Sequence, residues 1–247
     1  MTMQLLGVFF VGLAASFLSG IAGGGAGLIT IPLLIFLGID PKITAATTTF
    51  GGLGLGIGAL FRFRKEKNLR KQYSKPFTLI SIFAGLCGPF ILFFLESSWV
   101  KIVVGSIILL IVPLFLLKKK IGTEQKETSQ RKKIIGYLLY ALLLTLQVAF
   151  GSGIGIAIIF VLVAFFGLTL IETSATLRLP QLVSSFISLF LYGYQGLLDY
   201  RYGIVLMLAM ILGGYLGSHV AIKAGNAVIR WVFAAMAAIL AVILLIQ

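Results

Sequence analysis

Two glycine-rich runs inside apolar sequence are the first candidates for a chemical site. The first, Gly20–Gly27, contains three consecutive glycines, and the second, Gly151–Gly155, follows Gln147. Glycine allows tight turns and close approach of the backbone to a ligand. Backbone amides freed where a helix is broken, together with the positive ends of half-helices, bind anions. The runs therefore predict an anion site whose members are Gly23, Gly24, Gly25, Gly27, Gln147, Gly151, Ser152 and Gly153.

Glycine can instead serve only to bring two membrane helices close together. That alternative stays open for both runs, and it is the interpretation that we favour for the spaced pairs Gly54/Gly58 and Gly213/Gly217. Three glycines in a row favour a binding site, because non-helical backbone is tolerated at membrane depth only where it is buried or lines a cavity.

A polar stripe opens the apolar segment that follows each glycine run. The stripe comprises Thr44, Thr47, Thr48 and Thr49 in the first half of the chain and Thr173, Ser174, Thr176 and Arg178 in the second. Hydroxyl groups can donate hydrogen bonds to an oxyanion, so the predicted substrate site includes Thr44, Thr47, Thr48, Thr173 and Thr176. The alternative is that each hydroxyl bonds a carbonyl of the preceding helical turn, which is common in membrane helices.

Arg178 is the most unusual polar residue, because it stands inside an apolar segment, five residues after Thr173. Ionisable residues at membrane depth are costly and usually functional. The planar fork of a guanidinium matches the oxygens of sulfite, sulfonate or carboxylate, so we predict that Arg178 binds the substrate. Two alternatives remain open, an ion pair with Glu172 and extension of the side chain to the inner surface. Glu172 could carry a coupling proton, although its place near the start of the segment favours a solvated position.

The single histidine, His219, and the single cysteine, Cys87, are interpreted as packing residues. One residue of each kind excludes an internal disulfide and multi-histidine or multi-thiolate metal sites, so we predict neither a metal nor a cofactor. A Ser152–His219 pair would be needed for an intramembrane serine enzyme. Because the Gly-x-Ser-x-Gly context of such a nucleophile is missing, we expect no enzymatic activity.

Composition determines the class of protein to which these residues belong. Of the 247 residues, 60% are hydrophobic and only 11% are charged, whereas soluble domains carry about 25% charged residues. The apolar residues come in blocks rather than in alternation, which excludes a membrane β-barrel. The pattern predicts an all-α polytopic integral membrane protein.

Ten apolar segments follow one another in two sets of five. In each set the second segment is short and joined to the first by a glycine run, which predicts broken or re-entrant helices near the membrane midplane. The first repeat comprises residues 1–117, a basic linker residues 118–133, and the second repeat residues 134–247. The segments are Leu5–Ile21, Leu28–Leu37, Ile43–Phe61, Phe77–Leu95, Val100–Leu117, Ile134–Phe150, Ile154–Leu168, Thr173–Tyr194, Gly203–Ala221 and Ala227–Ile246.

The two sets are copies, because a shift of 129 positions lays one over the other without a gap, with Gly24 on Gly153 and Thr44 on Thr173. Equivalent loops carry opposite charge bias, which predicts inverted copies with both termini outside and the basic loops inside. The competing arrangement has eight spans in two parallel sets of four, with both termini inside.

Charge is concentrated in two loops. The chain has 20 basic and 7 acidic residues, and fourteen of the basic residues lie between Arg62 and Lys75 or between Lys118 and Lys133. This is the positive-inside pattern of cytoplasmic loops beside an anionic leaflet. It favours the lipid bilayer as the partner of these charges and excludes nucleic acid.

The run Gly20–Gly27 with Pro32, Gly38 and Ala45–Thr48 resembles the signature of the sulfite exporter TauE/SafE family. The resemblance extends to the length, the two homologous halves and the glycine-rich stretch that opens each half. It implies transport of sulfur-containing anions, such as sulfite or organosulfonates, across a prokaryotic plasma membrane. The second half departs from the pattern, with Gly-Ser-Gly-Ile-Gly in place of a triple glycine, Val161 in place of a proline, and Arg178 at the position equivalent to Thr49.

The sequence therefore predicts a secondary transporter of a small sulfur-containing anion that works by alternating access between its two repeats. The alternatives are an anion channel or a transporter of a non-sulfur anion such as a carboxylate. A coupling proton or cation and a homodimeric assembly are both compatible with the sequence.

Overall fold

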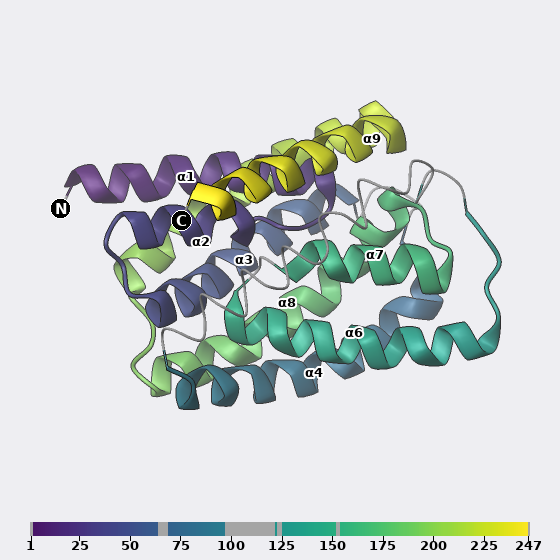
Figure 1. Ribbon diagram of the computed structural model, residues 1–247, viewed down its shortest axis with the longest axis horizontal. Helices are drawn as coiled ribbons and strands as arrows, with labels where there is room; N and C mark the ends of the chain where they lie inside the picture. Colours follow the sequence, from purple (N-terminus) through teal and green to yellow (C-terminus); the bar gives the residue numbers. More distant parts are fainter. Residues whose placement is uncertain (1, 64–68, 97–121, 123–124, 152–153, 247) are drawn as a thin grey trace.

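The computed structural model of the chain describes residues 2–63, 69–96, 122, 125–151 and 154–246, and over these residues it is helical without a β-strand (Figure 1). Six of the described helices are long and apolar enough to cross a membrane, which confirms the prediction of an all-α polytopic membrane protein. The predicted segment Val100–Leu117 lies outside the described residues. The helices are α1 (Thr2–Ala22), α2 (Gly27–Phe36), α3 (Pro41–Phe63), α4 (Lys71–Phe94), α6 (Gln130–Phe150), α7 (Gly155–Phe166), α8 (Leu170–Tyr194) and α9 (Tyr200–Ile246).

The two short helices, α2 and α7, follow the glycine runs and return along the helix before them. α2 has 10 residues and α7 has 12, so each is about 15–18 Å long and crosses only about half of the hydrocarbon core. Phe166, at the end of α7, packs beside Gly136 near the start of α6. Each long and short pair is thus a hairpin that starts and ends on one side, as the glycine-broken segments predicted.

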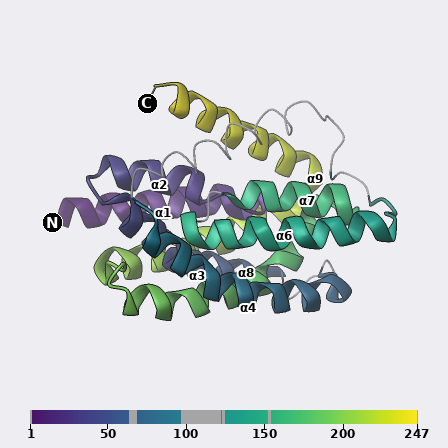
Figure 2. The same ribbon diagram turned by 60° about the horizontal axis from the view of Figure 1, so that its bottom comes forward.

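The last helix contains a change of direction at Gly225. The backbone there is not helical, with φ +79° and ψ 176°, which is a conformation that glycine adopts readily. Tyr200–Gly225 forms one candidate membrane span. The ribbon beyond Gly225 leaves the direction of this span, as the separate yellow segment in Figure 2 shows.

The helices of the two halves recur at the spacing found in the sequence. α3 and α4 begin 129 residues before α8 and α9, and α1 and α2 begin 128 residues before α6 and α7. Contacts between helices follow the same correspondence. α1 packs on α9, and their equivalents in the other half, α6 and α4, also pack on each other. α3 and α8 contact each other in opposite directions, with Gly52 beside Ser185 and Gly56 beside Leu182. These features agree with two inverted copies, and that relation stays a prediction.

Described parts of both basic loops lie at the same end of the bundle, which we call the basic end. Arg70 from the first loop donates to the Gln125 side chain of the linker at 2.8 Å. Lys133, near the start of α6, lies 5.8 Å from the ring centre of Tyr73. The positive-inside rule predicts that this end faces the cytoplasm.

Glycines of α3 and α9 hold the helices in close contact. A Cβ atom on Gly54 would lie 2.1 Å from the carbonyl oxygen of Met207, and one on Gly58 would lie 2.2 Å from that of Ile211. On α9, a Cβ on Gly213 or Gly217 would come within 2.4 Å of an α1 carbonyl oxygen. The packing interpretation of these four glycines is therefore confirmed, as small residues allow backbone contact between membrane helices.

Cys87 does not pack in the core, because it is exposed on α4. Its interpretation as a packing residue was wrong. The neighbouring side chains Phe83 and Phe90 are also exposed, at 70% and 51%. An exposed apolar face of this kind is what a membrane-spanning helix presents to lipid.

We expect Gly54→Ala or Gly58→Ala to lower the thermal unfolding midpoint in detergent. Because each Cβ meets a backbone carbonyl, α3 and α9 must separate, and overpacking of this kind destabilises by about 1–3 kcal/mol. Gly52→Ala is the matched control on α3, since its Cβ would lie 3.8 Å from the Ser185 hydroxyl. Equal midpoints for the Gly54 and Gly52 variants would contradict the packing assignment.

Candidate functional site

A small cavity lies between the two glycine breaks and the central helices α3 and α8. Its volume is about 30 Å³, whereas one water needs about 10–15 Å³ measured in this way. A space of this size suits a group of a few atoms. The lining residues are Gly24, Gly25, Ala26, Thr49, Gly52, Leu55, Gln147, Val148, Gly155, Arg178, Gln181, Ser184 and Ser185.

The two glycine breaks touch each other at one wall of the cavity. A Cβ on Gly155 would lie 3.0 Å from the backbone nitrogen of Gly25 and 3.4 Å from Oε1 of Gln147. Gly23 and Gly25 both have φ of +90°, a region in which other residues are strained. A Cβ on Gly23 would also lie 1.9 Å from the hydroxyl of Ser174. Glycine is therefore needed both for the backbone conformation and for the close approach of α8.

Arg178 places a full positive charge in this cavity. Its side chain is 0% exposed, and a guanidinium stays protonated in proteins. Nη2 donates to the carbonyl oxygen of Gly23 at 3.0 Å, whereas Nε and Nη1 have no partner. The charge is thus anchored to the first glycine break and keeps two nitrogens available for another acceptor.

Arg178 neither pairs with Glu172 nor extends to the inner surface, which were the two alternatives that the sequence left open. Glu172 forms its ion pair with Arg70 rather than with Arg178. A fully buried side chain also does not extend to the inner surface. Because an unpaired buried charge is strongly destabilising, the arrangement favours an anionic ligand.

The cavity brings together equivalent positions of the two halves. Thr49 and Arg178, Gly52 and Gln181, and Leu55 and Ser184 are each 129 positions apart, and all six line the cavity. The second half supplies the guanidinium, an amide and a hydroxyl, whereas two of the three positions in the first half are glycine and leucine. The scaffold is repeated, but the polar lining belongs largely to α8.

The structure brings only some of the predicted glycine-run residues to the cavity. Gly24, Gly25, Gln147 and Arg178 line it, and Gly23 contacts Arg178 through its carbonyl. Gly27 begins α2 and is buried. Gly151, with φ +89°, packs on Ile31 and the Ala45 carbonyl outside the cavity lining. Ser152 and Gly153 lie outside the described residues.

The predicted threonines do not line the cavity. The hydroxyls of Thr44 and Thr48 donate to the backbone carbonyls of Ile39 and Thr44, at 3.4 and 2.7 Å. Thr47 and Thr173 are buried without a hydrogen-bond partner for the hydroxyl. For Thr48, the alternative of bonding to the preceding helical turn describes the structure, whereas the Thr44 hydroxyl bonds to Ile39 before the start of α3.

Four polar lining residues were missing from the predicted site, namely Thr49, Gln181, Ser184 and Ser185. A signal for three of them was present, because Gln181, Ser184 and Ser185 follow Arg178 at spacings of three, six and seven. On a helix these spacings place side chains on one face.

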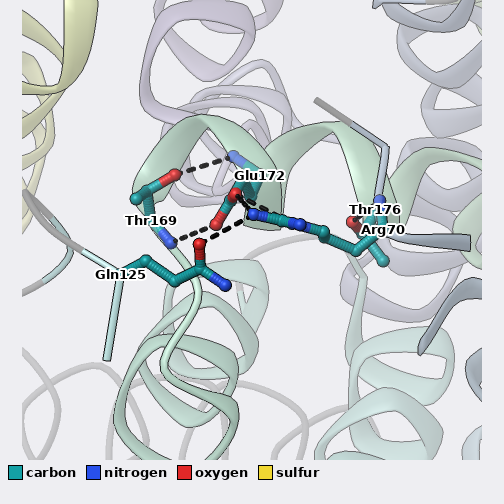
Figure 3. Close-up of polar contacts among 5 residues, drawn as sticks. All are labelled: Arg70, Gln125, Thr169, Glu172 and Thr176. Carbon is teal, nitrogen blue, oxygen red and sulfur yellow. Dashed lines mark hydrogen bonds and ion pairs between the residues drawn. The ribbon is translucent and has the colours of Figure 1, made fainter. Parts of the chain in front are cut away.

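A second polar cluster joins the two halves at the basic end (Figure 3). Nε of Arg70 donates to Oε1 of Glu172 at 2.9 Å, and Nη2 contacts the same oxygen. The backbone nitrogen of Arg70 donates to the Thr176 hydroxyl at 3.2 Å, which assigns Thr176 to this cluster. Thr169 and Glu172 also form a reciprocal capping box that begins α8.

Glu172 is therefore less solvated than its position in the sequence suggested. It is 9% exposed, and it accepts from Arg70 and from the backbone of Thr169 at 3.0 Å. Sequence position missed this because Arg70, which covers Glu172, comes from the other half of the chain.

His219 is likewise more than a packing residue. Its Nδ1 accepts from Nε of Arg62 at 3.1 Å. This contact corrects the packing interpretation, and it joins the last turn of α3 to α9.

The fold and the cavity define a multi-pass membrane protein with a buried cationic site between two bundles of helices. Residues 8–244 match the model of the family described as "Sulfite exporter TauE/SafE". The chain therefore belongs to the TauE/SafE family of membrane transporters.

Several curated relatives agree with this assignment. A protein of Haemophilus influenzae named "Probable membrane transporter protein" is 31% identical over 236 residues, which cover 92% of this chain and 89% of the relative. "Probable membrane transporter protein YfcA" of Escherichia coli K12 is 27% identical, with 98% of this chain and 90% of the relative covered. "Probable membrane transporter protein ORF9" of a Sinorhizobium species is 26% identical, with 90% and 85% covered. No solved structure matches the chain.

We expect Arg178→Met to raise the thermal unfolding midpoint in detergent while abolishing the stabilisation that a bound anion gives. Methionine keeps the volume of the side chain and removes a buried charge that has no ion-pair partner. For the unchanged chain, an anion at 100 times its Kd adds about 2.7 kcal/mol. Thermal unfolding with and without sulfite measures both effects.

Thr145→Ala on α6 is the control for these measurements, because its hydroxyl bonds within the helix to the Ala141 carbonyl and does not line the cavity. An Arg178→Met protein that keeps its response to sulfite would contradict the anion site. An unfolded Arg178→Met protein would instead show that Arg178 holds the fold.

Proposed function

We propose that the chain moves a small sulfur-containing oxyanion, such as sulfite or a small organosulfonate, across the plasma membrane by secondary transport. The observation that carries the proposal is the guanidinium of Arg178, which is fully buried and has two nitrogens without a partner. An oxyanion would accept from those nitrogens and neutralise the charge. In a site of low dielectric, such charge-assisted hydrogen bonds are strong.

The remaining lining supports an oxyanion rather than an apolar substrate. The side-chain amides of Gln147 and Gln181 and the hydroxyl of Ser185 provide donors around the cavity, whereas the Ser184 hydroxyl donates to the Gln181 backbone carbonyl at 3.0 Å. Oε1 of Gln147 has no partner, and exchange of the two amide ends would turn a donor toward the same place. The volume of about 30 Å³ suits an anion of a few atoms.

The sulfur assignment is supported by the family description, "Sulfite exporter TauE/SafE". A guanidinium fork also binds carboxylates, so the same site could serve a small carboxylate. A transport assay must therefore compare the two classes directly.

Alternating access is the mechanism that we propose for this site. The cavity lies between α3 and α8, which belong to different halves, so movement of one half against the other would expose it to one side at a time. Arg70 and Glu172 join the two halves at the basic end. We assign to this ion pair the role of closing the site toward the cytoplasm. Glu172 would be free to take a coupling proton once the pair opens.

We expect proteoliposomes containing the chain to take up radiolabelled sulfite with saturation. Arg178→Lys should lower kcat/KM about tenfold, because a lysine keeps the charge but loses the two-point contact. Arg201→Lys, at the exposed start of α9, is the matched control and should leave uptake unchanged. Unlabelled sulfite and a small organosulfonate should compete, whereas acetate should not.

The other outcomes of this assay identify the alternatives. Competition by acetate but not by sulfur anions would replace the substrate class with carboxylates and leave transport standing. Large currents in a planar bilayer that do not saturate with anion concentration would replace the carrier with a channel.

We expect Arg70→Glu to open the site toward the basic end, because two acidic residues would then face each other. A Thr176→Cys reporter, in a chain whose Cys87 is replaced by serine, measures this opening. Thr176 is buried beside Arg70, so its reaction with a membrane-impermeant thiol reagent should become several-fold faster in the Arg70→Glu chain.

The charge-exchanged double variant, Arg70→Glu with Glu172→Arg, is the control for this experiment. It should restore slow labelling, because the ion pair is rebuilt with its partners exchanged. Fast labelling in the double variant, or no change in the single variant, would contradict the closing role of the pair.

A further inference from the structure

A groove at the side of the bundle lies away from the central cavity. It runs between α3 and α9 and has a volume of about 650 Å³. Its apolar walls include side chains that are exposed on the surface, with Phe61 at 66%, Leu212 at 53% and Tyr215 at 45%. In a membrane such side chains face lipid. The residues that the argument uses are Phe61, Arg62, Ile211, Leu212, Tyr215 and His219.

One end of this groove carries two polar nitrogen groups. Arg62 lies in the last turn of α3, and its Nε donates to Nδ1 of His219 at 3.1 Å. Because Nδ1 accepts this bond, the neutral imidazole carries its proton on Nε2, which is then a donor. The Arg62 guanidinium carries five N–H donors and a permanent charge, so it can bond a phosphate oxygen in addition to its contacts within the protein. The pair offers a phosphate group both charge and hydrogen bonds.

The position of the pair fits the depth of lipid headgroups. Arg62 lies at the same end of the bundle as Arg70 and the linker, where the membrane span of α3 ends. Lys223, one helical turn beyond His219 on α9, is exposed and adds a further positive charge. None of the groove-lining residues is acidic. An apolar groove with a cationic end at the cytoplasmic surface is the pattern of a site for an anionic lipid.

We propose that this groove binds one anionic phospholipid of the inner leaflet, with its phosphate on Arg62 and His219 and an acyl chain along Ile211 and Leu212. The lipid would bridge α3 and α9, which belong to different halves of the chain. The proposal is independent of the transported substrate, because none of these residues lines the central cavity.

Native mass spectrometry of the detergent-purified chain tests the proposal with phosphatidylglycerol and phosphatidylcholine of the same acyl chains. We expect one phosphatidylglycerol to be retained in preference to phosphatidylcholine. Arg62→Gln should weaken its binding about fivefold, since one basic residue near a membrane surface contributes about 1 kcal/mol. Lys71→Gln is the matched control, because Lys71 is exposed at the same end but outside the groove.

Leu212→Trp provides a second test that leaves the charges unchanged. Leu212 is half exposed, so the larger side chain can be accommodated in the fold, and it should fill the groove and prevent retention of the lipid. An equal loss of phosphatidylglycerol retention in Arg62→Gln and Lys71→Gln would show general attraction of the lipid to positive charge, and it would overturn the proposed site. Displacement of the lipid by excess inorganic phosphate, or retention in Leu212→Trp, would also overturn it.

Discussion

The buried charge of Arg178 is the constraint on which the centre of this molecule depends. A guanidinium in the interior of a membrane protein is unfavourable unless other groups compensate it. Here the compensation comes from a carbonyl at the first glycine break, which is available because Gly23 leaves the helical conformation. Three features therefore depend on one another: the glycine break after α1, the approach of α8 to Gly23, and the two nitrogens of Arg178 that have no partner. In the function that we propose, an anionic substrate would complete this arrangement.

Close packing of backbones makes this centre small. Glycines of α3 and α9 let the helices approach until carbonyl groups would collide with any Cβ atom. Protein interiors of this kind do not deform continuously, so the proposed change of access would require movement of whole helices. The hairpins α1–α2 and α6–α7 bring their breaks to the contact between the halves, and the cavity lies at that contact.

The two halves share a scaffold but differ in their side chains. At equivalent positions of the cavity lining, the second half has Arg178, Gln181 and Ser184 where the first half has Thr49, Gly52 and Leu55. A substrate would therefore be held mainly by the second half. The same asymmetry exists at the ends. Arg70 pairs with Glu172 at the basic end, whereas Asp199, the equivalent of Arg70, accepts from the backbone of Arg201 and Tyr202 at the start of α9.

The sequence by itself determined the membrane class, the short helices after the glycine runs and the importance of Arg178, because hydropathy, glycine spacing and a lone charge are local properties. It also determined the packing role of Gly54 and Gly58, which follows from their spacing on one helix. It misplaced the hydroxyl groups of Thr44 and Thr48, and it missed the partners of Glu172 and His219. Those contacts join residues more than 100 positions apart. Only the tertiary structure decides them, because the packing of α3, α4, α8 and α9 determines which faces meet, and no local pattern specifies that.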